Sequence, residues 1–284
     1  MTNGPGWWVT RGAALVGAAG TGLAWRARHV VPYRPRLERI DVPVPFGHAG
    51  LVGMRLAFVA DMHMSPFFSQ ANLRDAVALL DGEPFDLALL GGDYASETVR
   101  YIDRGMPVLD DFVAWARVGA FGVLGNHDEQ LGSDKVIAAF DAHGIPLLRN
   151  EARPVAFGGD ALWVVGIDDA LANHHDPATA FRGVPPGAAS LVLWHEPDWA
   201  QEAAECGAFL QLSGHTHGGQ IRLPGKGALA LPPGGRRYEM GRYSIGAMTL
   251  YVSRGVGTYR PPARFRCPPE VTLITLVAPT TAMG

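Results

Sequence analysis

Cysteine is scarce in this chain of 284 residues, which contains only Cys206 and Cys267. The two lie far apart and form no Cys-x-x-Cys pattern. Disulfide frameworks and thiolate metal sites need several cysteines at short, regular spacings. The sequence therefore argues against both, and the two thiols are expected to be structural residues.

An excess of charge of one sign is also absent. The formal net charge is −3, from 24 basic and 27 acidic residues. A chain so close to neutral exerts no bulk attraction on nucleic acid or on an acidic membrane surface. We therefore expect no nucleic-acid partner, and any anion must be bound by a local group of residues. No feature of the sequence points to an obligate protein partner.

The N-terminal part lacks a hydrophobic run long enough to be a clear membrane span. Its uncharged run, residues 12–25, is rich in glycine and alanine and falls short of the roughly 18 apolar residues of a clean spanning helix. Tryptophans stand near both ends of this run, as they do at membrane interfaces: Trp7, Trp8 and Trp25. We expect this segment to be a membrane anchor, with an export signal or an ordinary exposed helix as the alternatives.

Arginines gather after this run rather than before it. Only Arg11 precedes it, whereas five follow: Arg26, Arg28, Arg34, Arg36 and Arg39. Because positive charge marks the cytoplasmic flank of a membrane segment, a retained anchor would leave the main domain in the cytoplasm, and export is the alternative. Prolines then punctuate a linker. We divide the chain into an anchor or signal-like segment with its linker, residues 1–35, and a main domain, residues 36–284.

Short apolar runs alternate with helix-like stretches in the first part of the main domain. The expected strands are residues 37–44, 55–60, 86–90, 120–124, 162–167, 191–194 and 209–212. The expected helices are residues 72–80, 108–117 and 133–142, each followed closely by a glycine that can end it. This alternation indicates an α/β domain with right-handed crossovers.

From Gln220 the pattern changes to strands alone. They are expected at residues 220–223, 237–245, 248–253 and 271–276. A run of strands after an alternating region suggests a second sheet that closes over the first within the same domain.

Side chains that can bind metal follow five of the expected strands. They are Asp61 and His63, Asp93, Asn126 to Asp128, His195, and His215 with His217. In an open α/β sheet, ligands bind outside the carboxyl ends of the strands, so residues far apart in sequence meet there. One polar residue after a strand is commonly a solvated loop residue. Five such strand ends are difficult to explain by packing, and they indicate a shared metal site.

The order of these residues resembles that of a known family. It reads Asp61-x-His63, Gly92-Asp93, Gly125-Asn126-His127-Asp128, His195 and Gly214-His215-x-His217. In this order the chain resembles the calcineurin-like metallophosphoesterase superfamily over nearly all residues after the linker. Three more segments are similar to its bacterial YaeI/YkuE-like phosphodiesterase branch: Gly218-Gly219-Gln220, Leu223-Pro224 and Pro268-Pro269-Glu270. The resemblance implies a four-layer αββα sandwich, in which two mixed β-sheets are flanked by helices.

The resemblance also implies two divalent metal ions. One would be held by Asp61, His63 and His217, the other by Asn126, His195 and His215, and Asp93 would bridge both. Two such ions can share a bridging hydroxide and clamp the attacking and leaving oxygens of an in-line displacement at phosphorus. The positive charge of the two ions exceeds the negative charge of the two ligand carboxylates, and this surplus suits a phosphate anion. Mixed oxygen and imidazole ligands fit Mn, Fe or Zn.

Two residues are expected to act on the substrate beside the metals. The resemblance implies that His127 contacts the phosphoryl oxygen next to Asn126 and protonates the leaving group, with Asp93 as the second catalytic residue. Ser96 stands where protein phosphatases of this superfamily carry an aspartate that orients this histidine. Protein phosphatase activity is therefore not expected.

Arginines after residue 235 could bind a second part of the phosphate, because a guanidinium binds phosphate through two hydrogen bonds. We expect Arg237 to do so, and the alternative is that these arginines are exposed charges on hairpins. Met64, Phe67 and Phe68 follow the first ligand loop. If exposed, they would form an apolar mouth and favour a lipid-bearing substrate; core packing is the alternative.

We therefore predict a dinuclear metal hydrolase that cleaves a phosphodiester or pyrophosphate bond. A lipid-linked or nucleotide-sugar substrate is favoured, of the kind cleaved by UDP-2,3-diacylglucosamine hydrolases in the neighbourhood of this branch. A phosphomonoesterase of small metabolites is the second interpretation. A catalytically silent scaffold with this fold is the third, and ligand-type residues at all seven metal positions argue against it.

Overall fold

The computed structural model describes residues 20–279 of the chain. Most of the predicted anchor lies outside the described residues, and the assignment of residues 1–35 stays a prediction. Among residues 20–279, no helix combines the length and the apolar character needed to cross a membrane. A helix at residues 20–29 leads through the 3-10 turn η1 (Val31–Tyr33) into the first strand, which begins at Arg36.

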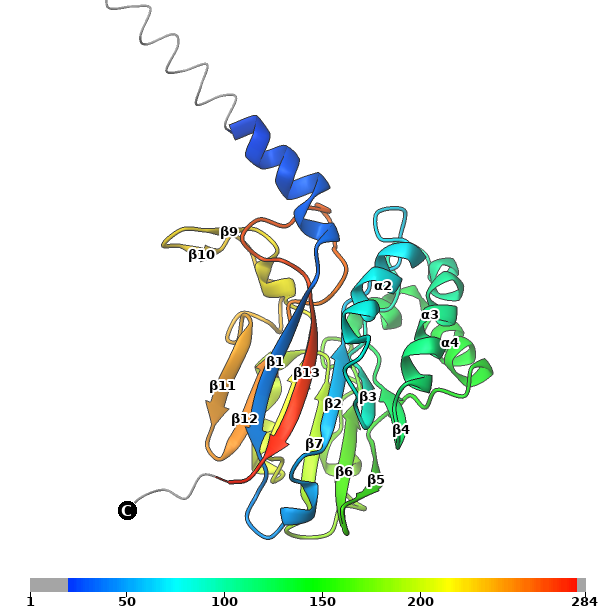
Figure 1. Ribbon diagram of the computed structural model, residues 1–284, viewed down its shortest axis with the longest axis vertical. Helices are drawn as coiled ribbons and strands as arrows, with labels where there is room; N and C mark the ends of the chain where they lie inside the picture. The colour runs from blue at the N-terminus through cyan, green and yellow to red at the C-terminus, as the bar shows by residue number, and fades with distance from the viewer. Residues whose placement is uncertain (1–19, 280–284) are drawn as a thin grey trace, which may run out of the picture.

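The first sheet has five strands, in the order β1 (Arg36–Pro43), β13 (Glu270–Val277), β2 (Arg55–Val59), β3 (Leu87–Leu90) and β4 (Gly119–Gly122). β2, β3 and β4 run parallel, as the strand and helix alternation predicts, and β13 runs antiparallel to β2. Three helices lie beside this sheet (Figure 1): α2 (Gln70–Val77), α3 (Ile102–Ala114) and α4 (Asn126–Ala142). The last strand thus joins the first sheet and not the second, contrary to the grouping expected from the sequence.

The second sheet has six strands, in the order β11 (Gly241–Ile245), β12 (Met248–Val252), β8 (Leu210–Ser213), β7 (Ala189–Trp194), β6 (Asp160–Ile167) and β5 (Glu151–Phe157). The inner strands are parallel and both edge strands are antiparallel to their neighbours. The short helices α5 (Pro177–Ala180) and α6 (Ala200–Glu205) connect these strands, and β9 (Arg222–Leu223) and β10 (Gly227–Ala228) form a separate hairpin. Further 3-10 turns are η2 (Ala49–Leu51), η3 (Ala78–Leu80), η4 (Val99–Tyr101), η5 (Pro197–Trp199) and η6 (His217–Gly219).

The period-two alternation of strand side chains fills three apolar layers. In β2, Leu56 and Phe58 enter the core between the sheets, whereas Ala57 and Val59 pack under the helices. In β7, Leu193 faces the core between the sheets and its neighbours face the outer cluster with α5 and α6. Two mixed sheets with helices on their outer faces confirm the predicted αββα sandwich.

Three elements differ from the sequence prediction for identifiable reasons. α3 begins at Ile102 and contains Pro107, a residue that normally argues against a helix interior. α4 begins at Asn126, but Gly132 interrupts it with a left-handed φ of 107°, so only its second half carries an uninterrupted helical pattern. β5 is an edge strand whose residues are mostly exposed or half-buried, and its Pro154 is tolerated because the outer edge of this strand has no partner strand for a backbone N–H to bond.

Candidate metal centre

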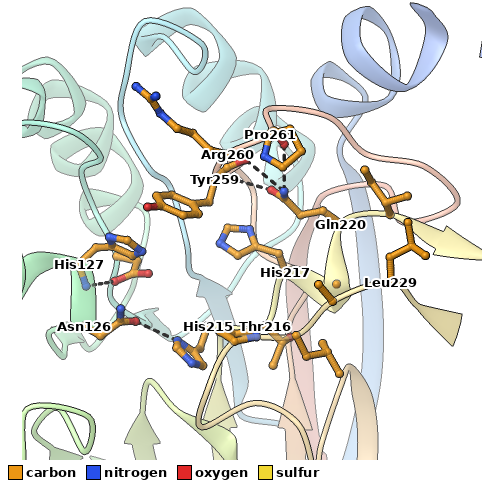
Figure 2. A pocket seen from close by; sticks show the side chains of 16 residues that line it. Asn126, His127, His215, Thr216, His217, Gln220, Leu229, Tyr259, Arg260 and Pro261 are labelled. Carbon is orange, nitrogen blue, oxygen red and sulfur yellow. Dashed lines mark hydrogen bonds between the residues drawn. The ribbon is translucent and has the colours of Figure 1, made fainter. Parts of the chain in front are cut away.

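All seven predicted metal ligands gather beyond the carboxyl ends of β2, β3 and β4 in the first sheet and of β7 and β8 in the second. Asp61 and His63 follow β2, and Asp93 follows β3. Asn126 is the first residue of α4, after β4 and the short loop at residues 123–125. His195 follows β7, and His215 with His217 follows β8. Each is buried, with at most 7% of its surface exposed. The convergence predicted for strand ends therefore occurs, and Figure 2 shows Asn126, His215 and His217 around one cavity.

The first group consists of Asp61, His63 and His217, whose ligand atoms all lie within 4.8 Å of one another. The Nε2 atoms of His63 and His217 face each other at 2.9 Å, and His217 Nε2 lies 3.6 Å from Asp61 Oδ1. Lone pairs that converge in this way repel unless a proton or a cation lies between them. The arrangement fits a bound divalent ion.

Asp93 stands between the two predicted metal positions. Its Oδ2 atom lies 3.3 Å from His63 Nε2 and 3.2 Å from His195 Nε2, two histidines that the sequence assigns to different ions. Its Oδ1 atom accepts a hydrogen bond from the backbone N–H of His127 at 2.9 Å. One carboxylate oxygen thus faces both groups while the other is held by the start of α4.

The second group is centred on His195 and His215. His215 Nδ1 lies 2.9 Å from Asn126 Oδ1 (Figure 2). Glu196 also has a ligand atom within 4.8 Å of those of the two histidines, and sequence reasoning missed it. It is fully buried, and its Oε1 atom has no hydrogen-bond partner among the described residues. The sequence signal that could have found Glu196 is its position as a charged residue just after a buried strand.

The outer nitrogen of each histidine is fixed by a neighbour. His195 Nδ1 donates to the Gly91 carbonyl at 2.6 Å, and His215 Nε2 donates to the Pro233 carbonyl at 2.7 Å. These bonds leave His195 Nε2 and His215 Nδ1 free to face the site, as in metal centres where the second nitrogen sets the tautomer. His63 Nδ1 is hydrogen-bonded to Ser96 Oγ. Ser96 therefore lies against His63 and not against His127.

The ligand loops hold an unusual backbone conformation. The φ angles of Asp61, His63, Asp93, His215 and His217 lie between 46° and 71°, although none is glycine. Left-handed residues of this kind are disfavoured by roughly 1–3 kcal/mol each and persist where the surrounding structure enforces them, commonly at functional sites. Two glycines beside these loops leave no room for a side chain. A Cβ at Gly214 would lie 2.5 Å from Asp61 Oδ2, and one at Gly125 would lie 2.3 Å from Asp93 Oδ1.

Asp128 ties the second and third ligand loops together. Its carboxylate accepts hydrogen bonds from the backbone N–H groups of Asp93, Tyr94 and Gly125, at 2.8, 3.0 and 2.9 Å. The side chain is fully buried and does not face the cavity. The fourth residue of the motif at 125–128 is therefore a structural clamp on Asp93.

Asp198 has a similar role for the loop at residues 232–239. Its carboxylate accepts hydrogen bonds from the backbone N–H groups of Arg236 and Arg237, each at 2.9 Å. The same loop presents the Pro233 carbonyl to His215. Asp198 thus holds in place the segment that orients one of the predicted ligands.

Burial decides the charge of several groups in the centre. It lowers the pKa of His215 to about 4 and also lowers the pKa of His217, so both imidazoles are neutral at pH 7. It raises the pKa of Asp61 to about 6, which leaves this carboxylate mostly ionised. Burial also opposes the charge of Asp93, but His195 and His63 outweigh it and hold the pKa well below its usual range. Burial also opposes the charge of His195, but Asp93 and Asp61 outweigh it and hold the pKa of this imidazole well above its usual range, so His195 must lose a proton to bind metal. Neutral imidazoles and ionised carboxylates are the metal-binding forms.

The buried donor set fits divalent metal ions. Asp61 Oδ2 and His195 Nε2 are buried, and neither makes a hydrogen bond of ordinary geometry with a described residue. Unsatisfied buried polar atoms are rare and call for a cause such as a bound ion. Carboxylate, amide and imidazole groups without thiolate suit ions such as Mn, Fe and Zn.

A cavity of about 510 Å³ opens beside the centre (Figure 2). His127, His215 and His217 line it, together with residues 219–221, 229–232 and 259–261. Sequence reasoning missed Tyr259, whose ring packs on His127 with centroids 4.5 Å apart. Arg260 also lines the cavity, and its guanidinium pairs with Glu97 at 2.8 Å.

Two expectations about the substrate side of the site are not met. Arg237 does not line this cavity: it is exposed, and its guanidinium lies 5.3 Å from the centre of the Tyr238 ring. Met64 and Phe68 are buried in the core under α2 and α3, so they form no apolar mouth and the core-packing alternative is correct for them. Phe67 lies under the guanidinium of Arg28. The apolar surface near the centre is instead the 229–232 wall.

Comparison with known proteins agrees with this geometry. Residues 54–219 match the calcineurin-like phosphoesterase family. The chain is 30% identical to the metallophosphoesterase YkuE of Bacillus subtilis over 93% of this chain and 94% of that protein. It is 34% identical to the phosphodiesterase YaeI of Escherichia coli, over 78% and 82% of the two chains.

A third relative has a more specific name. The chain is 25% identical to the UDP-2,3-diacylglucosamine pyrophosphatase LpxG of Chlamydia trachomatis, over 89% of this chain and 92% of that protein. The family match and the two bacterial relatives confirm the resemblance seen in the motifs. The chain belongs to the calcineurin-like phosphoesterase family, and it is a metallophosphoesterase, a hydrolase.

Proposed function

We propose that the protein hydrolyses a phosphodiester or pyrophosphate bond with two divalent ions. Their ligands are Asp61, His63, Asp93, Asn126, His195, His215 and His217. The position of Asp93 Oδ2 carries this proposal, because it faces His63 Nε2 at 3.3 Å and His195 Nε2 at 3.2 Å. When bound, two such ions lower the pKa of a water molecule and neutralise charge on the phosphate.

The protein's own residues would position the ester. His127 lies on the cavity wall, and its backbone N–H fixes Asp93 while the Tyr259 ring supports its imidazole. Burial lowers the pKa of His127, so at pH 7 the imidazole is neutral and would donate a hydrogen bond to a phosphoryl oxygen. Asn126 presents its side chain beside it (Figure 2). We propose these two as the substrate contacts closest to the bond that breaks.

The lining of the cavity favours a diester or a pyrophosphate over a monoester. A monoester carries two negative charges on the phosphoryl group that is attacked, whereas a diester, or each phosphorus of a pyrophosphate diester, carries one. Arg260 is the single lining lysine or arginine in the described chain, and Glu97 already neutralises it, so no free cation is present to balance the second charge. The volume of about 510 Å³ also leaves room for a second substituent. The relatives YaeI and LpxG are named a phosphodiesterase and a pyrophosphatase.

Metal removal tests this function. Protein depleted with a chelator is expected to lose at least about a hundredfold in the hydrolysis of bis(p-nitrophenyl) phosphate, because the ions contribute several kcal/mol of stabilisation to the transition state. Reloading with Mn, Fe or Zn in separate samples should restore it. The intact enzyme should cleave p-nitrophenyl phosphate more slowly. Turnover that survives full depletion, or a preference for the monoester, would contradict the proposal.

We further propose that one substituent of the substrate is apolar. Ile221, Leu231 and Pro232 contribute to the cavity wall, and Leu229 beside them is 59% exposed. An exposed leucine at the rim of a pocket is favourably covered by an acyl chain or another apolar group. A lipid-linked substrate fits this wall, as does the named substrate of LpxG, a diacylated nucleotide sugar.

Polar replacement of the wall tests the apolar substituent. The double variant Leu229→Asn, Leu231→Asn is expected to lower kcat/KM about 10- to 100-fold for a p-nitrophenyl diester that carries an octyl group, because each leucine contributes about 1–2 kcal/mol of apolar contact. For the methyl diester, kcat/KM should change less than about threefold. Val118→Asn, an exposed apolar residue outside the cavity lining, is the matched control. Equal losses on both diesters would contradict an apolar subsite.

A further inference from the structure

A second groove lies where the helix at residues 20–29 meets the body. It has a volume of about 420 Å³ and lies between residues 23–36 and residues 265–268. Four arginines line it, Arg26, Arg34, Arg36 and Arg266, together with apolar residues that include Leu23 and Phe265. No acidic residue is among the lining residues. We call this surface the arginine groove.

The charge of the arginine groove is not neutralised within the described chain. None of its four guanidinium groups forms an ion pair or hydrogen bond with any of residues 20–279. Some other arginines are paired, as Arg39 is with Glu83. All four arginines are exposed. The chain as a whole carries −3, so this groove is a local concentration of positive charge on a protein that is otherwise slightly acidic.

Apolar side chains stand directly beside these arginines. The helix at residues 20–29 projects from the body (Figure 1), and residues 20–26 are all exposed. Leu23, which lines the groove, is 52% exposed. Trp25 is 62% exposed but lies outside the lining, with its ring centroid 5.6 Å from that of His29. Ala27 fixes the base of the helix, because its carbonyl accepts a hydrogen bond from the Arg264 backbone N–H at 2.8 Å. Tryptophan and leucine next to clustered arginine are typical of a membrane interface.

The arginine groove and the catalytic cavity share one segment of chain. Phe265 of the groove forms a β-bridge with Ile221 of the cavity wall. The Phe265 N–H donates to the Gln220 carbonyl at 2.8 Å, and the Arg222 N–H donates to the Phe265 carbonyl at 3.0 Å. A ligand bound at the arginine groove would therefore lie close to the catalytic cavity and to the apolar wall of that cavity.

We propose that the arginine groove docks on an anionic phospholipid surface. The four guanidinium groups bind headgroup phosphates, and Leu23 enters the boundary between headgroups and acyl chains. A nucleic acid would satisfy the arginines but would leave Leu23 without an apolar partner. The combination of free arginines with an exposed leucine in one groove therefore favours the lipid surface. The proposal concerns binding alone and stands apart from the catalytic function.

Vesicle binding by the full chain tests the docking surface. The measurement is the ratio of partition coefficients for vesicles with 30% phosphatidylglycerol and for vesicles of phosphatidylcholine alone, at about 0.1 M salt. The double variant Arg34→Glu, Arg266→Glu is compared with Arg153→Glu, Arg182→Glu, which makes the same change of net charge away from the groove. We expect the control to keep the ratio of the unaltered chain and the groove variant to lower it at least about tenfold.

Further outcomes separate lipid docking from an effect of net charge and from nucleic-acid binding. A ratio near one for the unaltered chain, or equal ratios for the two variants, would overturn the proposal. So would binding of a DNA duplex that depends on the same arginines and exceeds the binding to anionic vesicles. Hydrolysis of bis(p-nitrophenyl) phosphate by both variants checks that they are folded, because neither pair lines the catalytic cavity. A loss of this hydrolysis in all forms would contradict the catalytic proposal and leave the vesicle ratio interpretable.

Discussion

The variant Asp93→Ala is expected to lower diester hydrolysis by about a hundred- to a thousandfold, while the protein stays folded. The reason is the place of this carboxylate between the two ligand groups, where Oδ2 faces His63 and His195 and Oδ1 holds the backbone of His127. Removing it would leave both ions short of a ligand and release the residue proposed to contact the phosphate. A catalytic group of comparable importance typically contributes two to three orders of magnitude.

Metal content and kinetics should be measured together for this variant. We expect the unaltered protein to bind about two ions per chain and Asp93→Ala to bind fewer, with kcat lowered far more than KM is raised. Asp75→Ala, an exposed carboxylate on α2, is the matched control and should leave both quantities unchanged. If Asp93→Ala retained two ions and more than about a tenth of the activity, the bridging role would be wrong.

Most residues of the centre could be predicted because they follow a short, buried strand within a few residues. Asp61, Asp93 and His195 carry this signal in the local sequence, and parallel strands bring their carboxyl ends together without further information. The same local rule predicted β2, β3 and β7, whose runs are apolar on both faces. Features that depend on a few consecutive residues could therefore be predicted from the sequence.

Features that depend on distant segments could not be predicted. β13 lies between β1 and β2, a pairing set by the whole sheet and not by its own eight residues. Tyr259 reaches His127 only because the segment after β12 folds back over the centre. Arg237 was expected at the site from its charge alone, but Asp198 holds its backbone so that the side chain lies on Tyr238.

Asp128→Ala should show how much the centre depends on residues that do not face the cavity. We expect it to lower the free energy of unfolding by about 3–5 kcal/mol. The fully buried carboxylate accepts three backbone N–H groups, and its removal would leave each of them without a partner at a cost of roughly 1–3 kcal/mol. Partial relaxation of the loops keeps the total below the sum.

Urea unfolding of the metal-depleted protein would measure this effect without the contribution of bound ions. Asp134→Ala removes an exposed carboxylate from the same helix and should change the free energy by less than about 0.5 kcal/mol. Asp128→Asn keeps one acceptor oxygen, so it should fall between the two. If Asp128→Ala cost less than about 1 kcal/mol, the clamp on the Asp93 loop would be dispensable. The left-handed conformation of Asp93 would then be held by Gly92 and Gly125 alone, where an added Cβ would approach the facing backbone to within 2.6 Å.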